Sequence, residues 1–206
     1  MPLTRRCAYD ELLPTHLLRR NTNMSAFIEP PKRIGWLLRI GIRISRRVTG
    51  KDILVAGLLS WYPKAAYGSA MLESLVVHHD KTLDDRIIKL VRIQASISSA
   101  CPFCVDMNSF EYKNAGITDT EYASLKTSGN YADVHTFTRR EEVAIEYARL
   151  ISQTPLVFPE PFVAELKETF QEREIVILAS TAAQVNYWAR LNSALGVPSA
   201  GFMEEV

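Results

Sequence analysis

Apolar runs in this chain of 206 residues are short. One of the longest, from Ile53 to Ser60, falls far below the roughly 20 residues that a membrane-spanning helix needs. The N-terminal region also lacks the apolar segment of a secretory signal peptide. With 47% apolar and 23% charged residues, the composition is that of an ordinary globular protein. We therefore expect a cytoplasmic protein that does not act in a membrane.

Cysteine is scarce in the chain. The three cysteines, Cys7, Cys101 and Cys104, do not make the even disulfide framework of a small secreted protein. The chain has no second C-x-x-C motif and no C-x-x-C…H-x-H pattern, so a zinc site is not expected. Covalent haem attachment needs a histidine after the second cysteine, where this sequence has Val105. We expect no metal and no cofactor.

Convincing strand alternation and the glycine-rich loops of nucleotide-binding proteins are also absent. Apolar residues recur instead at helical spacing, and Thr118 and Thr138 each precede a glutamate at the distance of a capping box. The fold class that this pattern predicts is all-α, a single domain of about eight helices. The segments expected to be helical are residues 33–48, 53–60, 65–78, 83–98, 104–114, a short stretch from 118, 138–153, 160–170 and 173–195.

Positive charge is concentrated near the N-terminus. Residues 1–51 hold 11 Lys and Arg against 3 Asp and Glu, whereas the rest of the chain holds 13 against 20. The basic amphipathic helix expected over residues 33–48 suits either a membrane or nucleic-acid surface, or packing against acidic residues of this chain or a partner subunit. Because residues 52–206 carry more acidic than basic residues, we favour packing of this helix against acidic residues. We therefore expect neither nucleic acid nor a membrane as a partner.

The first 23 residues differ from the rest. Residues 1–23 contain two Arg-Arg pairs and only short apolar pieces, and we expect them to be a disordered or non-native N-terminal segment. Met24 is a second possible start of the protein. Residues 24–206 then form the expected domain.

The stretch from Cys101 to Cys104, with Pro102 inside it, carries the clearest chemistry. Proline is well tolerated at the first position of a helix, so Cys101 is expected to cap a helix and Cys104 to lie in its first turn. A thiolate there gains from unpaired N–H groups and from the helix dipole, which lower its pKa. A thioredoxin-like motif would follow a strand, whereas the flanks here are helical. The alternative to a reactive pair is an inert buried pair, because free cysteine commonly packs as a small core hydrophobe.

The run from Asp84 to Ser96, followed by Ser99 to Met107, resembles the carboxymuconolactone decarboxylase family, in particular its alkylhydroperoxidase (AhpD-like) branch. The segment from Asn186 to Asn192 is similar to the last core helix of that branch. The resemblance extends over most of the chain and implies an all-helical homo-oligomer. The lactone decarboxylase that names the family does not rely on such a cysteine pair, so the cysteines favour the redox branch.

In the peroxidases of that branch, the second cysteine attacks the peroxide and the first resolves the sulfenic acid to a disulfide. The resemblance therefore assigns these catalytic roles to Cys104 and Cys101. A glutamate and a histidine relay protons in those peroxidases, at positions where this chain has Lys89 and Asn108. Neither side chain replaces a carboxylate–imidazole relay. Both residues are possible accessory residues of the site: Lys89 would lower the thiol pKa as a fixed positive charge, and Asn108 would hydrogen-bond a thiolate. The alternative is that both side chains lie on a polar helix surface and have no role at the thiols.

These observations predict a thiol-dependent oxidoreductase that reduces a hydroperoxide or exchanges disulfides, with an external thiol or dithiol as reductant. The alternative is a non-catalytic or redox-sensing helical oligomer that keeps the fold and has lost the proton relay. Further proton carriers, which the sequence does not place relative to the sulfurs, are Glu73, His78, His79, Asp106 and Glu111.

Overall fold

The computed structural model describes residues 26–74, 79–127 and 136–205, and none of these residues lies in a strand. The helices are α1 (Trp36–Thr49), α2 (Leu54–Leu58), α3 (Pro63–Ser74), α4 (Asp85–Ser98), α5 (Pro102–Ser109), α6 (Asp119–Lys126), α7 (Arg139–Ile151), α8 (Glu160–Thr169) and α9 (Glu172–Ala194). The all-α prediction is therefore confirmed. The N-terminal segment 1–23 and His78 lie outside the described residues.

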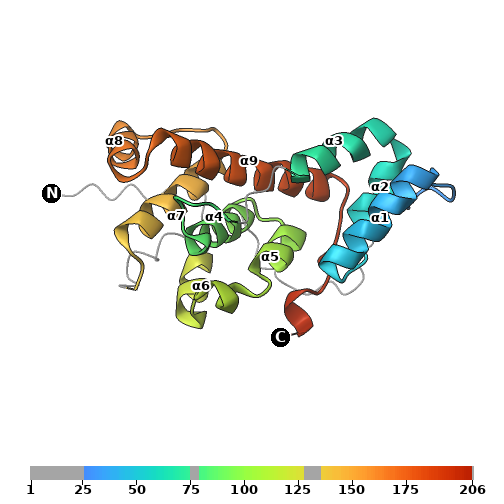
Figure 1. Ribbon diagram of the computed structural model, residues 1–206, viewed down its shortest axis with the longest axis horizontal. Helices are drawn as coiled ribbons and strands as arrows, with labels where there is room; N and C mark the ends of the chain where they lie inside the picture. Colours follow the sequence, from blue (N-terminus) through green and yellow to red (C-terminus); the bar gives the residue numbers. More distant parts are fainter. Residues whose placement is uncertain (1–25, 75–78, 128–135, 206) are drawn as a thin grey trace.

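Helix α4 lies at the centre of the molecule, beside α5, α7 and α9 (Figure 1). Its apolar side chains pack in two directions. One group meets α7 and α9: Ile87, Ile88, Val91 and Ala95 against Val143, Ala144, Leu178 and Ala182. The other meets α6, the turn before it and α7: Leu90 and Ile93 against Ile117, Leu125 and Ile145. Because α4 is buried on several faces, it is a rigid base for the cysteine pair that follows it.

The two predicted capping boxes are present. At the start of α6, Thr118 and Glu121 bond to each other's backbone N–H, and Thr138 and Glu141 do the same at the start of α7. In each glutamate, Oε2 accepts the capping hydrogen bond of its own helix, and Oε1 accepts a hydrogen bond from Arg86 of α4. The local caps are thereby tied to the central helix.

The helix that starts at the cysteine pair is shorter than the sequence predicts. We expected it to continue to Asn114, but α5 ends at Ser109, and Phe110 and Glu111 leave the helical conformation. Glu111 takes a left-handed conformation with φ 54°. Lys89 of α4 donates a hydrogen bond of 2.6 Å to the Phe110 carbonyl. This tertiary contact satisfies a carbonyl at the helix end, which the local sequence does not reveal.

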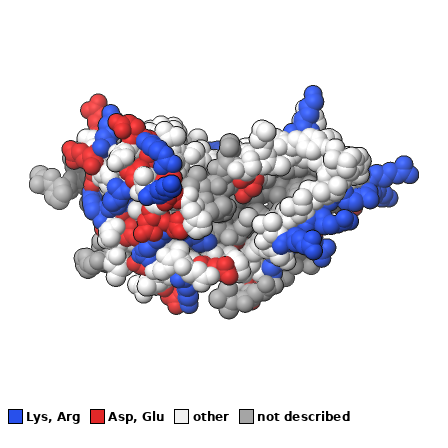
Figure 2. All heavy atoms as spheres, in the orientation of Figure 1, with Lys and Arg blue, Asp and Glu red and all other residues white. Residues whose placement is uncertain are grey.

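Helices α1, α2 and α3 lie together near the C-terminal end of α9 (Figure 1). No residue of α1 is buried, and Leu37, Ile44 and Val48 are each more than half exposed. The arginines of α1 gather on its outer side, whereas the surface between α1 and α3 is hollowed and largely uncharged (Figure 2). The described helices include none that is long and apolar enough to cross a membrane.

Candidate active site at Cys101 and Cys104

The cysteine pair lies at the start of α5, as the sequence predicts. Cys101 is the N-cap residue, Pro102 is the first helical residue, and the Cys104 N–H donates a hydrogen bond of 3.2 Å to the Cys101 sulfur. The two sulfurs are joined in a disulfide, with Cα atoms 5.3 Å apart. Ala100, just before the cap, has φ 49° and turns the chain sharply from α4 into α5.

Two sets of polar contacts hold this turn in place. Ser99, before the cap, directs its hydroxyl at two acceptors, the Ala95 carbonyl at 2.7 Å and Asn186 Oδ1 of α9 at 3.0 Å, which share its one proton. After the cap, Asp106 accepts N–H bonds from Ala200, Phe202 and Met203. Burial raises the pKa of Asp106, but the backbone donors outweigh it and the pKa is lowered. Asp106 thus anchors the C-terminal segment, with both carboxylate oxygens engaged by backbone donors.

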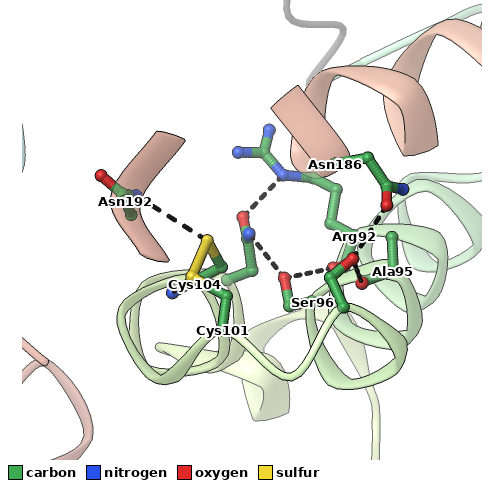
Figure 3. Close-up of a disulfide and its surroundings, with 9 residues drawn as sticks. Arg92, Ala95, Ser96, Cys101, Cys104, Asn186 and Asn192 are labelled. Carbon is green, nitrogen blue, oxygen red and sulfur yellow. Dashed lines mark hydrogen bonds between the residues drawn. A yellow bond between two sulfur atoms is a disulfide. The ribbon is translucent and has the colours of Figure 1, made fainter. Parts of the chain in front are cut away.

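The two sulfurs have different neighbours (Figure 3). Cys101 and Cys104 are both buried, at 1% and 3% exposure. Only the Cys101 sulfur receives a helix N–H among the described contacts, whereas the sequence suggested such donors for both thiols. The Cys104 sulfur instead lies 3.8 Å from Asn192 Nδ2 of α9. Asn192, which is fully buried, is a site residue that the sequence analysis missed.

A polar network connects α4 to α5 beside Cys104 (Figure 3). Asn108 Oδ1 accepts from Arg92 Nε at 3.0 Å, and Asn108 Nδ2 donates to Ser96 Oγ at 2.9 Å. Asn108 is 9% exposed and Ser96 is fully buried. Asn108 is therefore not a surface amide, and the polar side of α4 faces α5 at Arg92 and Ser96. The sequence places Arg92 and Ser96 on that polar side, but not beside the cysteines.

Lys89 lies at the opposite end of α5 from the cap. Its hydrogen bond goes to the carbonyl of Phe110, six residues beyond Cys104, which corresponds to about 9 Å along a helix. Burial, followed by repulsion from Arg92, lowers the pKa of Lys89 to about 8, and Glu111 acts in the opposite sense. These contacts show Lys89 holding the end of α5; an effect on the thiol pKa stays a prediction.

Cys104 lines an apolar cavity of about 710 Å³ that lies between α1, α3, α5 and α9. Cys101 is not among its lining residues. Leu38, Ile42, Val55, Met107 and Val185 supply part of its apolar wall, and Glu73, Arg92 and Asn108 are polar residues in it. A molecule of moderate size can therefore reach the Cys104 side of the disulfide without passing Cys101.

Glu73 of α3 is a proton carrier that the structure does bring to this cavity. Its Oε2 accepts hydrogen bonds from Trp188 Nε1 at 2.8 Å and Gln184 Nε2 at 3.3 Å. His79 is exposed and contacts Asp85, away from the cavity lining. Among the described residues, His, Cys, Asp and Glu side chains form no group of three that would hold a metal ion.

Comparison with known proteins relates this arrangement to a group of helical proteins. No protein-family model matches the chain. The uncharacterized protein YnjA of Escherichia coli K12 is 25% identical over 178 residues, covering 84% of this chain and 94% of YnjA.

Two solved structures have the same arrangement of helices. An uncharacterized peroxidase-related protein from Ralstonia eutropha JMP134, described as an alkylhydroperoxidase AhpD core, superposes with a TM-score of 0.69 at 14% identity, covering 86% of this chain and 94% of that one. The debrominase Bmp8 in complex with 2,3,4-tribromopyrrole superposes with a TM-score of 0.67 at 16% identity, covering 88% and 98%. The chain therefore has the AhpD-like fold, which confirms the fold that its sequence resemblance implied.

Proposed function

We propose that the protein is a thiol-dependent oxidoreductase in which Cys104 attacks a hydroperoxide or a disulfide and Cys101 resolves the product. The observation that carries this proposal is a Cys101–Cys104 pair at a helix start, with one sulfur at the wall of an apolar cavity. Cavities of this size and lining are typical of sites for small organic molecules. The cavity position supports Cys104 as the attacking residue, as the family resemblance also does.

With a hydroperoxide, the reaction takes two steps in the protein. The Cys104 thiolate attacks one peroxide oxygen, the O–O bond breaks, and the alkoxide takes up a proton and leaves as an alcohol, so that Cys104 becomes a sulfenic acid. The Cys101 thiolate then attacks the Cys104 sulfur, the hydroxide of the sulfenic acid leaves and takes up a proton to become water, and the disulfide forms. An external thiol or dithiol returns two electrons and restores both thiols. That reductant, a cytoplasmic location and a homo-oligomeric state remain part of the proposal.

A test of this proposal is the rate at which an organic hydroperoxide such as cumene hydroperoxide converts the reduced protein to the Cys101–Cys104 disulfide. At pH 7 we expect this rate to exceed that of glutathione oxidation by about tenfold or more. The reason is that the fraction of thiolate at pH 7 rises by about tenfold or more when the pKa of a thiol falls from about 8.5 to about 7. Mass spectrometry after quenching with an alkylating agent measures it.

Two other outcomes would count against the proposal. Oxidation no faster than that of glutathione would contradict it. Fast disulfide formation without turnover under excess dithiol would favour the redox-sensing alternative, which draws support from Lys89 and Asn108 occupying the relay positions.

A further inference from the structure

The cavity beside Cys104 contains a cationic group that the thiol chemistry described above does not use. Arg92 extends from α4 into the cavity lining, among mainly apolar side chains. Its Nε donates to Asn108 Oδ1. Its Nη1 is buried and has no hydrogen-bond partner among the described residues. A buried N–H without an acceptor is costly, and more so on a charged group, so an acceptor supplied by a ligand would remove that cost.

The protein compensates the charge of Arg92 only in part. Burial lowers the pKa of Arg92, and the favourable interaction with Glu73 does not fully offset it. Glu73 is also engaged, because its Oε2 accepts from Trp188 and Gln184. Lys89 adds a second positive charge near Arg92. The unpartnered N–H of Arg92 therefore favours an incoming acceptor, and the charge of Lys89 offsets the repulsion that the Glu73 carboxylate exerts on an anion.

The rest of the cavity favours an apolar body. Leu37, Ile44 and Val48 of α1 and Tyr67 of α3 line it, yet are at least half exposed in the described chain. Figure 2 shows this hollow as a largely uncharged surface, with Lys and Arg side chains along the α1 side. An apolar molecule there would cover these side chains and gain about 25 cal/mol for each Å² of apolar surface removed from water.

We propose that the cavity binds an apolar organic molecule with one carboxylate, which accepts a hydrogen bond from Arg92 Nη1 while the apolar body lies between α1 and α3. This binding does not depend on the reactivity of the thiols. This ligand site goes beyond the proposed function, because a ligand with a carboxylate would occupy the approach to Cys104 whether or not that ligand reacts with the cysteine.

Decanoate is a suitable probe, with decanol as the uncharged molecule of equal chain length. Isothermal titration of the oxidised full chain should show saturable binding of one decanoate per chain. The Arg92→Met variant should bind decanoate about 10- to 100-fold more weakly, the usual effect of losing a charge-assisted hydrogen bond, and should lose less affinity for decanol, whose uncharged hydroxyl accepts only an ordinary hydrogen bond from Arg92. Arg39→Met, which removes an exposed arginine of α1, should leave decanoate affinity within about twofold.

A second variant keeps the test decisive if Arg92→Met folds poorly. Gly41 of α1 lines the cavity, and a Cβ added there meets no atom within 4 Å. Gly41→Phe should therefore fold, fill part of the cavity, and weaken decanoate and decanol together. Equal binding of decanoate by wild type and Arg92→Met, or no binding by the wild type, would overturn the proposal. Because the oxidised protein is used, neither outcome depends on peroxide reduction.

Discussion

Replacing Cys104 with serine is expected to reduce hydroperoxide turnover by about three orders of magnitude or more, the scale seen when a covalent nucleophile is lost. A serine hydroxyl is not ionised at neutral pH and does not accept an oxygen atom from a peroxide as a thiolate does. Cys104 is also the cysteine that lines the cavity. Steady-state turnover with cumene hydroperoxide and excess dithiol measures the effect.

Cys101→Ser is the matched control, because it removes the second sulfur of the same pair. It should retain the first step and form one sulfenic acid per chain, detectable by a sulfenic-acid trap, while losing disulfide formation. The reverse pattern would show that the helix N–H directed at the Cys101 sulfur marks the attacking residue, and the assigned roles would be wrong. Full turnover by Cys104→Ser would contradict the proposed function itself.

The second large effect concerns stability. Arg86→Ala is expected to lower the free energy of unfolding by about 3–5 kcal/mol, the cost of removing one partner from a buried ion pair. The Arg86 side chain is 19% exposed and bonds Glu121 at 2.7 Å and Glu141 at 2.5 Å, whose side chains are 2% and 7% exposed. Without Arg86, two carboxylates lie buried close to each other. Urea unfolding followed by circular dichroism measures the change.

Arg139→Ala is the control for this prediction. Arg139 also pairs with two glutamates, Glu142 and Glu165, but its side chain is 67% exposed. Solvent screening limits such surface pairs, and we expect a loss within about 1 kcal/mol. Equal losses for Arg86→Ala and Arg139→Ala would contradict the structural role given to Arg86.

The Arg86 cluster also predicts how stability depends on pH. Burial raises the pKa of Glu121, but hydrogen bonds from Arg86, Thr118 and Thr136 lower it from 4.5 to about 2. A carboxyl whose pKa is depressed in the folded state stabilises that state above its unfolded pKa, and the stabilisation is lost as the pH falls through the folded pKa. The wild type should therefore lose stability between about pH 4.5 and pH 2, and Arg86→Ala should lose less over that range.

The parts of the structure that the sequence predicts well rest on signals within a few residues of each other. Pro102 after Cys101 indicates the start of α5, and threonine followed by glutamate three residues later indicates the starts of α6 and α7. In these cases the residues that form the sequence pattern are also the residues that make the capping contacts. The AhpD-like fold was accessible because the cysteine motif and the helix before it are contiguous in the chain.

The parts that the sequence does not predict depend on contacts between distant segments. Arg92 fits the periodicity of a polar helix face, and only the packing of α5 onto α4 places it beside Asn108, partly buried. Asn192 approaches Cys104 because α9 crosses the start of α5. The end of α5 at Ser109 likewise coincides with a bond from Lys89, on another helix. Helical periodicity shows that a face is polar, but not whether that face meets water or a neighbouring helix.

The pH dependence of Cys104 alkylation in the reduced protein shows whether Cys104 is an activated thiolate. Iodoacetamide labelling is followed by mass spectrometry, with Cys104→Ser and Cys101→Ser to assign the modified residue. The start of α5, the donor on Asn192 and the charge of Arg92 all favour the thiolate. We predict a midpoint well below the ordinary thiol value of about 8.5. A Cys104 that is inert, or that titrates near 8.5, would show that Cys104 is not an activated thiolate.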